Sequence, residues 1–116
     1  MVTHERLICS SDEVVEKGTG VRFAMPHLGE RETGFVVRYR GAVHGYINQC
    51  AHVPAPLDWN EGDFFDLTRT AIICATHGAQ YHPETGYCEL GPCKGKSLRK
   101  LNVIERDHKI YLLESN

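Results

Sequence analysis

The sequence lacks a long apolar run, an apolar leader and an excess of basic residues, and each absence excludes a class of function. No segment approaches the 18 or so consecutive apolar residues of a membrane-spanning helix. The first six residues contain no apolar stretch typical of a secretion signal. Thirteen basic residues stand against 15 acidic ones, whereas binding to nucleic acid or to an anionic membrane needs a basic face. We therefore expect a cytoplasmic protein that binds neither nucleic acid nor membranes.

The length of 116 residues and the mass of 13.1 kDa predict one domain, covering residues 1–116. Hydrophobic residues make up 41% of the chain, enough to form a buried core. Glycine and proline interrupt short apolar runs throughout, a pattern typical of small β-rich domains. Ser10 and Glu13 also form a capping-box pattern, which predicts a short helical turn after the first strand.

Apolar and alternating segments predict roughly eight to ten short strands. The expected strands are residues 6–9, 21–25, 35–40, 46–48, 71–73, 87–90, 98–106 and 109–114. Turns are expected at residues 41–45 and 107–108. The predicted fold class is all-β, a small antiparallel sandwich or barrel with long loops.

Five cysteines and seven histidines are the unusual part of this composition. An odd number of cysteines without a secretion signal does not fit a disulfide framework, so metal binding or redox chemistry is the better interpretation. Cys50-Ala51-His52 and Cys74-Ala75-Thr76-His77 each follow an expected strand directly, in the pattern C-x-H-x21-C-x2-H. Strands would give each Cys/His pair a rigid base, while the loops let the pairs converge.

This spacing bears on the choice of metal. In zinc sites the paired ligands are usually two to four residues apart, so that both reach one ion. The single residue between Cys50 and His52 makes that geometry awkward, and two metals a short distance apart are easier to reach. The two thiolates would then share one iron and the two imidazoles the other, as in a [2Fe–2S] centre with mixed ligands. A Cys2His2 zinc site remains the alternative.

At these residues the sequence resembles the Rieske iron–sulfur family, and Gly91-Pro92 stands where a Gly-Pro loop covers the cluster in that family. The resemblance implies one [2Fe–2S] cluster per chain, with Cys50 and Cys74 on the inner iron and His52 and His77 on the outer iron. It also implies three antiparallel β-sheets with the two cluster-binding loops at one tip.

The segment after the first motif is apolar and then acidic. In the family's arrangement its apolar residues would form a rim beside the histidines: Val53, Pro54, Pro56 and Leu57. Four acidic residues would put negative charge near the cluster end, to steer a basic partner or to keep the loop soluble: Asp58, Glu61, Asp63 and Asp66.

Differences from the high-potential members of the family point to a low midpoint potential. Ala55 and Thr76 replace the two cysteines that form a disulfide in respiratory and photosynthetic Rieske proteins. Ala79 replaces a serine that hydrogen-bonds a cluster sulfide in those proteins, while Tyr81 retains the tyrosine that bonds a cysteine sulfur. Hydrogen bonds to the sulfurs stabilise the reduced cluster, so we expect a potential near the low end of the family's range of about −150 to +300 mV.

Three cysteines lie outside the four-ligand set. Cys93 falls in the expected covering loop and could lie close to the cluster. A disulfide between Cys88 and Cys93 is conceivable but is disfavoured in a reducing cytosol. Cys9 is expected to be a small buried apolar residue.

The resemblance implies a stand-alone Rieske-type ferredoxin, an electron carrier and not an enzyme by itself. It would take one electron from a flavin- or NAD(P)H-linked reductase and pass it to a terminal oxygenase or a related enzyme. Two other functions stay open: a Rieske-fold accessory subunit, similar to the small subunit of nitrite reductases, and a zinc-binding interaction module.

Overall fold

The computed structural model describes residues 3–26, 28–30, 32–50, 57–58, 62–66, 68–74, 78–91 and 95–115. These residues form ten β-strands and one short 3-10 helix. The elements are β1 (Thr3–Ser10), η1 (Ser11–Glu13), β2 (Val21–Ala24), β3 (Thr33–Tyr39), β4 (Ala42–Ile47), β5 (Ile72–Ile73), β6 (Gln80–Tyr81), β7 (Cys88–Leu90), β8 (Lys100–Leu101), β9 (Val103–Arg106) and β10 (Lys109–Ser115). The described chain contains no helix long and apolar enough to cross a membrane.

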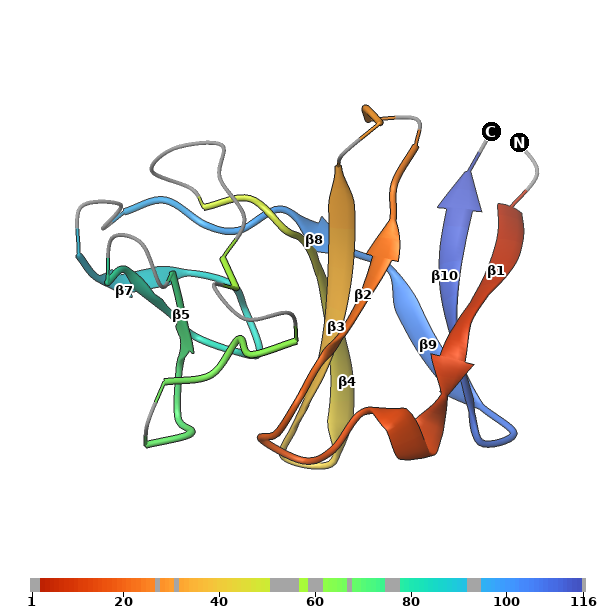
Figure 1. Ribbon diagram of the computed structural model, residues 1–116, viewed down its shortest axis with the longest axis horizontal. Coiled ribbons are helices and arrows are strands. Elements are labelled where there is room, and N and C mark those ends of the chain that lie inside the picture. The colour runs from red at the N-terminus through yellow and green to blue at the C-terminus, as the bar shows by residue number, and fades with distance from the viewer. Residues whose placement is uncertain are drawn as a thin grey trace.

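The strands form three antiparallel sheets, which confirms the predicted fold class. A middle sheet has the order β2-β3-β4-β8, a terminal sheet the order β1-β10-β9, and a small sheet the order β5-β6-β7. Figure 1 shows the terminal sheet and the small sheet on opposite sides of the middle one, with both chain ends beside the terminal sheet.

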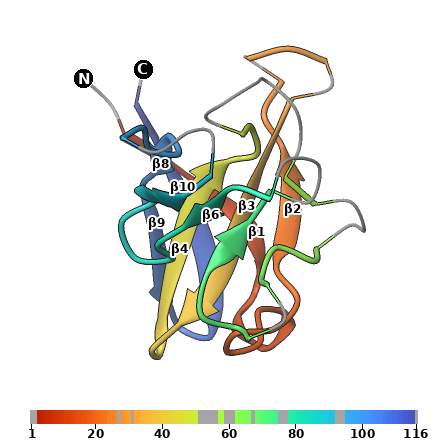
Figure 2. The ribbon, with the colours of Figure 1, turned by 90° about the vertical axis from the view of Figure 1, so that its left-hand side faces the viewer.

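The middle sheet separates two hydrophobic cores because successive side chains of β3 point to opposite faces. Phe35, Val37 and Tyr39 enter the core shared with the small sheet, whereas Val36 enters the core shared with the terminal sheet. All four residues are buried, as expected for a strand covered on both faces. Figure 2, seen from the side of the small sheet, shows that sheet in front of β3 and β4.

The hairpin between β3 and β4 is tighter than the sequence predicts. The expected turn at 41–45 is wrong, because Tyr39 already pairs with Ala42 and the loop consists of Arg40 and Gly41 alone. Both loop residues have positive φ, 53° and 80°, as a two-residue turn that matches the strand twist requires. His44, expected in that turn, lies within β4.

The C-terminal half of the chain differs from the prediction at two places. The single strand expected at 98–106 is divided at Asn102 into β8, in the middle sheet, and β9, in the terminal sheet. Strand β6 was not predicted, since its two residues carry no alternating pattern. The final hairpin is confirmed, with Arg106 paired to Lys109 around the turn at Asp107 and His108.

Two smaller predictions near the N-terminus are also confirmed. The backbone N–H of Ser10 donates a hydrogen bond to the Glu13 carboxylate at 2.8 Å, and η1 follows. Cys9 is buried in the core beneath the terminal sheet, where burial raises the pKa of its thiol to about 11. Such a thiol stays protonated near neutral pH and packs as a small apolar side chain.

Candidate metal centre

The first cysteine of the motif follows β4 closely. After Ile47 the chain leaves the strand at Asn48, whose N–H donates to the Thr33 carbonyl at 2.8 Å. Cys50 comes two residues later and is 4% exposed. Its thiol therefore lies at the end of a strand that is fixed in the middle of a sheet.

The second cysteine follows β5 directly, and its backbone closes the connection to β6. The N–H of Cys74 donates to the Ala79 carbonyl, and the N–H of Gly78 donates to the Cys74 carbonyl, each at 2.8 Å. Cys74 is 0% exposed. The sequence prediction that each Cys/His pair follows a strand is thus confirmed for both cysteines.

A tyrosine joins the two loops. The hydroxyl of Tyr81 lies 3.2 Å from the sulfur of Cys50, within hydrogen-bond distance, and both side chains are buried. Tyr81 belongs to β6, the strand that follows the Cys74 loop. Cys50, Cys74 and Tyr81 belong to one core cluster. The predicted contact between Tyr81 and a cysteine sulfur is therefore present.

The two histidines of the motif, His52 and His77, lie outside the described residues. Within the described residues there is no group of three or more His, Cys, Asp or Glu side chains that could hold a metal ion. The chemistry of the two cysteines nevertheless fits an iron–sulfur centre. Both are buried thiols that follow strands and share one hydrophobic core, and a tyrosine hydroxyl lies within hydrogen-bond distance of one of them, where it could stabilise a metal-bound thiolate.

The start of the expected covering loop packs against the second cysteine loop. Gly91 follows β7 with a φ of +107°, and a Cβ placed on it would stand 2.8 Å from the Cα of Ala79. Ala79 itself is fully buried. The Gly91 backbone thus lies directly on the residue that ends the Cys74 loop, while residues 92–94 lie outside the described part of the chain.

Two expectations for the segment after the first motif are wrong. Leu57, expected in an exposed apolar rim, is fully buried in the core beside the small sheet. Asp58, expected to present negative charge to a partner, has a side chain that is 0% exposed. The other three expected rim residues and Glu61 lie outside the described residues.

Cys88 is disulfide-bonded, contrary to the expectation for a reducing cytosol. Its side chain is 0% exposed and belongs to the same core cluster as Cys50 and Cys74. It pairs with Tyr81 across β6 and β7. The fifth cysteine, Cys93, lies outside the described residues.

Sequence reasoning missed a buried polar network beneath the Cys50 loop. The side-chain amide of Asn48 donates to Thr33 Oγ1 at 3.1 Å and to Asp58 Oδ1 at 3.0 Å, and its carbonyl oxygen accepts the Leu57 N–H at 2.8 Å. These bonds tie the chain before Cys50 to the chain after the loop. The nearest sequence signal was a polar residue, Asn48, two positions before Cys50.

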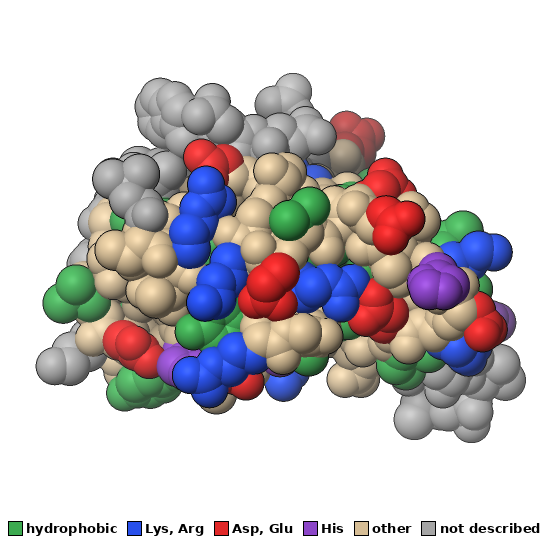
Figure 3. Space-filling model, turned by 90° about the horizontal axis from the view of Figure 1, so that it is seen from below, with side chains coloured by type: hydrophobic (Ala, Val, Ile, Leu, Met, Phe, Trp, Pro, Cys, Tyr) green, Lys and Arg blue, Asp and Glu red, His purple; other side chains and the backbone are tan. Residues whose placement is uncertain are grey.

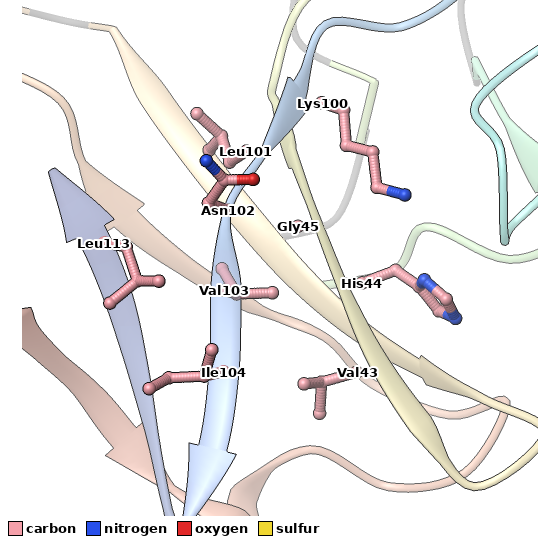
Figure 4. A pocket seen from close by; sticks show the side chains of 9 residues that line it. All are labelled: Val43, His44, Gly45, Lys100, Leu101, Asn102, Val103, Ile104 and Leu113. Atoms are coloured by element: carbon pink, nitrogen blue, oxygen red, sulfur yellow. The ribbon is translucent and has the colours of Figure 1, made fainter. Parts of the chain in front are cut away.

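One cavity of about 330 Å³ opens between β4 and the β8–β9 segment (Figure 4). Val43, His44, Lys100 and Val103 are among its lining residues. All of its lining residues come from the middle and terminal sheets or from the residue between β8 and β9. It is therefore separate from the two cysteine loops.

These observations define an all-β domain of three sheets, in which Cys50 and Cys74 each follow a strand and share one buried hydrophobic core. The model of the Rieske [2Fe-2S] domain family matches residues 4–110. This protein belongs to that family. A comparison with curated proteins finds no match.

Solved structures share the fold. The ferredoxin of carbazole 1,9a-dioxygenase from Nocardioides aromaticivorans IC177 superposes with a TM-score of 0.72 at 22% identity, over 93% of this chain and 95% of that one. The terminal oxygenase from the same organism gives a TM-score of 0.77 at 20% identity, over 97% of this chain but 30% of that one. The terminal oxygenase from Novosphingobium sp. KA1 gives 0.74 at 22% identity, over 94% and 29%.

Proposed function

We propose that this protein is a cytoplasmic Rieske-type ferredoxin that carries one electron at a time from a flavin- or NAD(P)H-linked reductase to a terminal oxygenase. The observation that carries the proposal is the contact between Tyr81 and Cys50, which joins the two cysteine loops in one buried cluster. The structural similarity to a ferredoxin along nearly its whole length supports it. So does the similarity to a complex of oxygenase and ferredoxin in carbazole 1,9a-dioxygenase, at 20% identity and a TM-score of 0.73.

The ligand set we propose is Cys50, His52, Cys74 and His77. A [2Fe–2S] cluster held by these side chains supplies reversible one-electron chemistry. With four protein ligands the irons have no open position for a substrate, which suits electron transfer rather than catalysis. Burial of both cysteines would keep water from their thiolates. The Tyr81 hydroxyl, 3.2 Å from the Cys50 sulfur, would donate a hydrogen bond to that sulfur as a metal-bound thiolate.

The charge on the face seen in Figure 3 does not favour a polyanionic partner, because acidic side chains lie beside the basic ones in both halves of the view. Ion pairs such as Arg38–Glu105 and Arg40–Glu84 show that basic side chains of the described residues have acidic partners. Nucleic-acid binding needs a basic stripe instead.

The experiment is metal and sulfide analysis of protein purified without oxygen, combined with electron paramagnetic resonance after reduction with dithionite. We expect two irons and two sulfides per chain and a rhombic signal with a low average g value, which reports imidazole ligation. One zinc per chain without sulfide would contradict the proposal and favour the zinc module.

Substitutions test the ligand set. His52→Ala and His77→Ala are expected to abolish the signal, as are Cys50→Ala and Cys74→Ala. The matched controls are His108→Ala, in an exposed turn, and Cys9→Ala, in the other core. Both controls are expected to retain the cluster. Loss of the signal in His108→Ala, or its retention in His52→Ala, would refute the assignment.

Delivery to an oxygenase is tested by stopped-flow mixing of the reduced protein with an oxidised Rieske oxygenase, followed by the visible absorption of both centres. Rapid one-to-one reoxidation of the ferredoxin is expected. Copurification of the protein in fixed ratio with one large enzyme, without reoxidation, would favour the accessory-subunit function instead.

A further inference from the structure

Asp58 is a buried carboxylate beneath the Cys50 loop that the proposed electron transfer does not use. Its side chain is 0% exposed. Burying a charge away from water is costly unless the charge is paired and hydrogen-bonded. Asp58 therefore needs partners that offset the cost of burying its charge.

The described groups around this carboxylate are all donors or cations. Oδ1 accepts a hydrogen bond from the Asn48 amide at 3.0 Å, and Oδ2 accepts one from the Gly62 N–H at 3.0 Å. The Arg22 Nε lies 3.6 Å from Oδ2. These partners match a carboxylate, which accepts hydrogen bonds through both oxygens and forms an ion pair with a guanidinium.

The two members of the ion pair differ in their contact with water. The side chain of Arg22 is 27% exposed, while that of Asp58 is 0% exposed. Water and salt screen the charge of Arg22 more effectively than that of Asp58. Arg22 therefore offsets the negative charge of Asp58 only in part.

The carboxylate is close to the Cys50 loop. Asn48, which hydrogen-bonds Asp58, stands two residues before Cys50. The 3.0 Å hydrogen bond, the Asn48 side chain, two Cα–Cα steps of about 3.8 Å and the Cys50 side chain together place the Asp58 carboxylate within about 17 Å of the Cys50 sulfur. At an effective dielectric constant of about 20, a unit charge at that distance changes a one-electron equilibrium about fivefold to tenfold.

We propose that the Asp58–Arg22 pair sets the midpoint potential of this protein. The Asp58 carboxylate opposes the arrival of the electron and lowers the potential, and the Arg22 guanidinium partly offsets it. The inference rests on the proposed function, because it requires a cluster bound through Cys50. The effect of the pair differs from that of hydrogen bonds to sulfur, because the pair acts through charge and not through contact with the cluster.

The test is redox titration, followed by electron paramagnetic resonance, of the loaded protein and of charge variants. Asp58→Asn should raise the potential by about 40 to 60 mV, the equivalent of a fivefold to tenfold change for one electron. Arg22→Gln should lower it by a smaller amount. Arg22→Lys, which keeps the charge, should leave it near the wild-type value, and the double variant Arg22→Gln with Asp58→Asn should lie between the two single variants.

Potential shifts of opposite sign in Asp58→Asn and Arg22→Gln distinguish an electrostatic role of the pair from a structural one. A substitution that merely loosens the loop would broaden the signal or release iron, and would not produce shifts of opposite sign in the two variants. If Asp58→Asn fails to load the cluster, the cause is its new side-chain amide, which faces other donors. In that event, comparing the potentials of Arg22→Gln and Arg22→Lys decides whether the pair acts through charge. Arg22 is partly exposed, and loss of its charge should shift the potential in the direction opposite to loss of the Asp58 charge.

The distant pair Glu5–Arg106, in the terminal sheet, provides the control. Glu5→Gln should not change the potential. Equal potentials for wild type, Arg22→Gln and Arg22→Lys, with the cluster signal intact, would overturn this inference and leave the proposed function standing. A wild-type protein without iron and sulfide would overturn both.

Discussion

Gly91 packs so close to Ala79 that a Cβ added to Gly91 would lie 2.8 Å from the Cα of Ala79 and 3.3 Å from its Cβ. Gly91 begins the Gly-Pro segment, and Ala79 ends the loop that starts at Cys74. The close approach holds the covering segment against the second cysteine loop. It also explains why residue 79 is small.

Replacing Gly91 with alanine should therefore destabilise the protein and weaken retention of the cluster. The positive φ costs about 1–2 kcal/mol for a residue with a Cβ, and the clash adds about 1–3 kcal/mol. The control is Gly95→Ala, where φ is +95° but nothing lies within 4 Å of the added Cβ. Urea denaturation of both variants separates strain from clash, and equal losses of stability would contradict the packing argument.

Replacing Tyr81 with phenylalanine should lower the midpoint potential. The variant loses the hydroxyl that lies 3.2 Å from the Cys50 sulfur, and hydrogen bonds to sulfur favour the reduced cluster. If the reduced cluster loses about 1.4 kcal/mol of stabilisation, the midpoint potential shifts by about −59 mV for a one-electron couple.

Tyr46 supplies the matched control for this measurement. It is also a fully buried tyrosine, but its hydroxyl donates to the Pro83 carbonyl at 2.7 Å and not to a sulfur. Burial raises the pKa of Tyr46, so its hydroxyl stays protonated. Tyr46→Phe should cost about 1 kcal/mol of stability and leave the potential unchanged. A similar potential shift in both variants would show that the effect of Tyr81 is not specific to sulfur.

The sequence predicted the all-β class and the positions of both cysteine loops, because these depend on local patterns. Cys50 and Cys74 each follow apolar residues that form β4 and β5. The break at Asn102 could not be predicted, since it arises where the chain passes from one sheet to another. The burial of Asp58 was missed for a similar reason: its partners Arg22, in β2, and Asn48, after β4, come from other segments of the chain, and a carboxylate in a polar loop looks solvated in the sequence alone.

Replacing Ala79 with serine should raise the midpoint potential toward that of the high-potential members of the family. The new hydroxyl would replace the hydrogen bond that the resemblance assigns to a serine at this position. A shift of a few tens of millivolts, up to about +59 mV, corresponds to a change of tenfold or less in the one-electron equilibrium. Redox titration measures it, and the control is Ala79→Gly, which adds no donor. An equal shift in both variants would show that packing against Gly91 matters rather than hydrogen bonding.

The Arg38–Glu105 ion pair should make stability depend on pH in the acid range. The guanidinium donates hydrogen bonds to both carboxylate oxygens, one of them at 2.9 Å, and joins β3 to β9. These bonds are the main cause that lowers the pKa of Glu105 from 4.5 to about 2. Because the folded pKa is depressed, the pair's contribution is complete above pH 4.5 and is lost as the pH falls toward 2.

Glu105→Gln should therefore lower the free energy of unfolding by about 0.5–1 kcal/mol at pH 7, a modest value because the pair is partly exposed. Urea denaturation between pH 7 and pH 3.5 should show this difference from the wild type constant above pH 4.5 and shrinking below it. The potential should not change, since Glu105 lies in the terminal sheet. A difference that stayed the same down to pH 3.5 would mean that the carboxylate charge contributes nothing and that the substitution acts through packing instead.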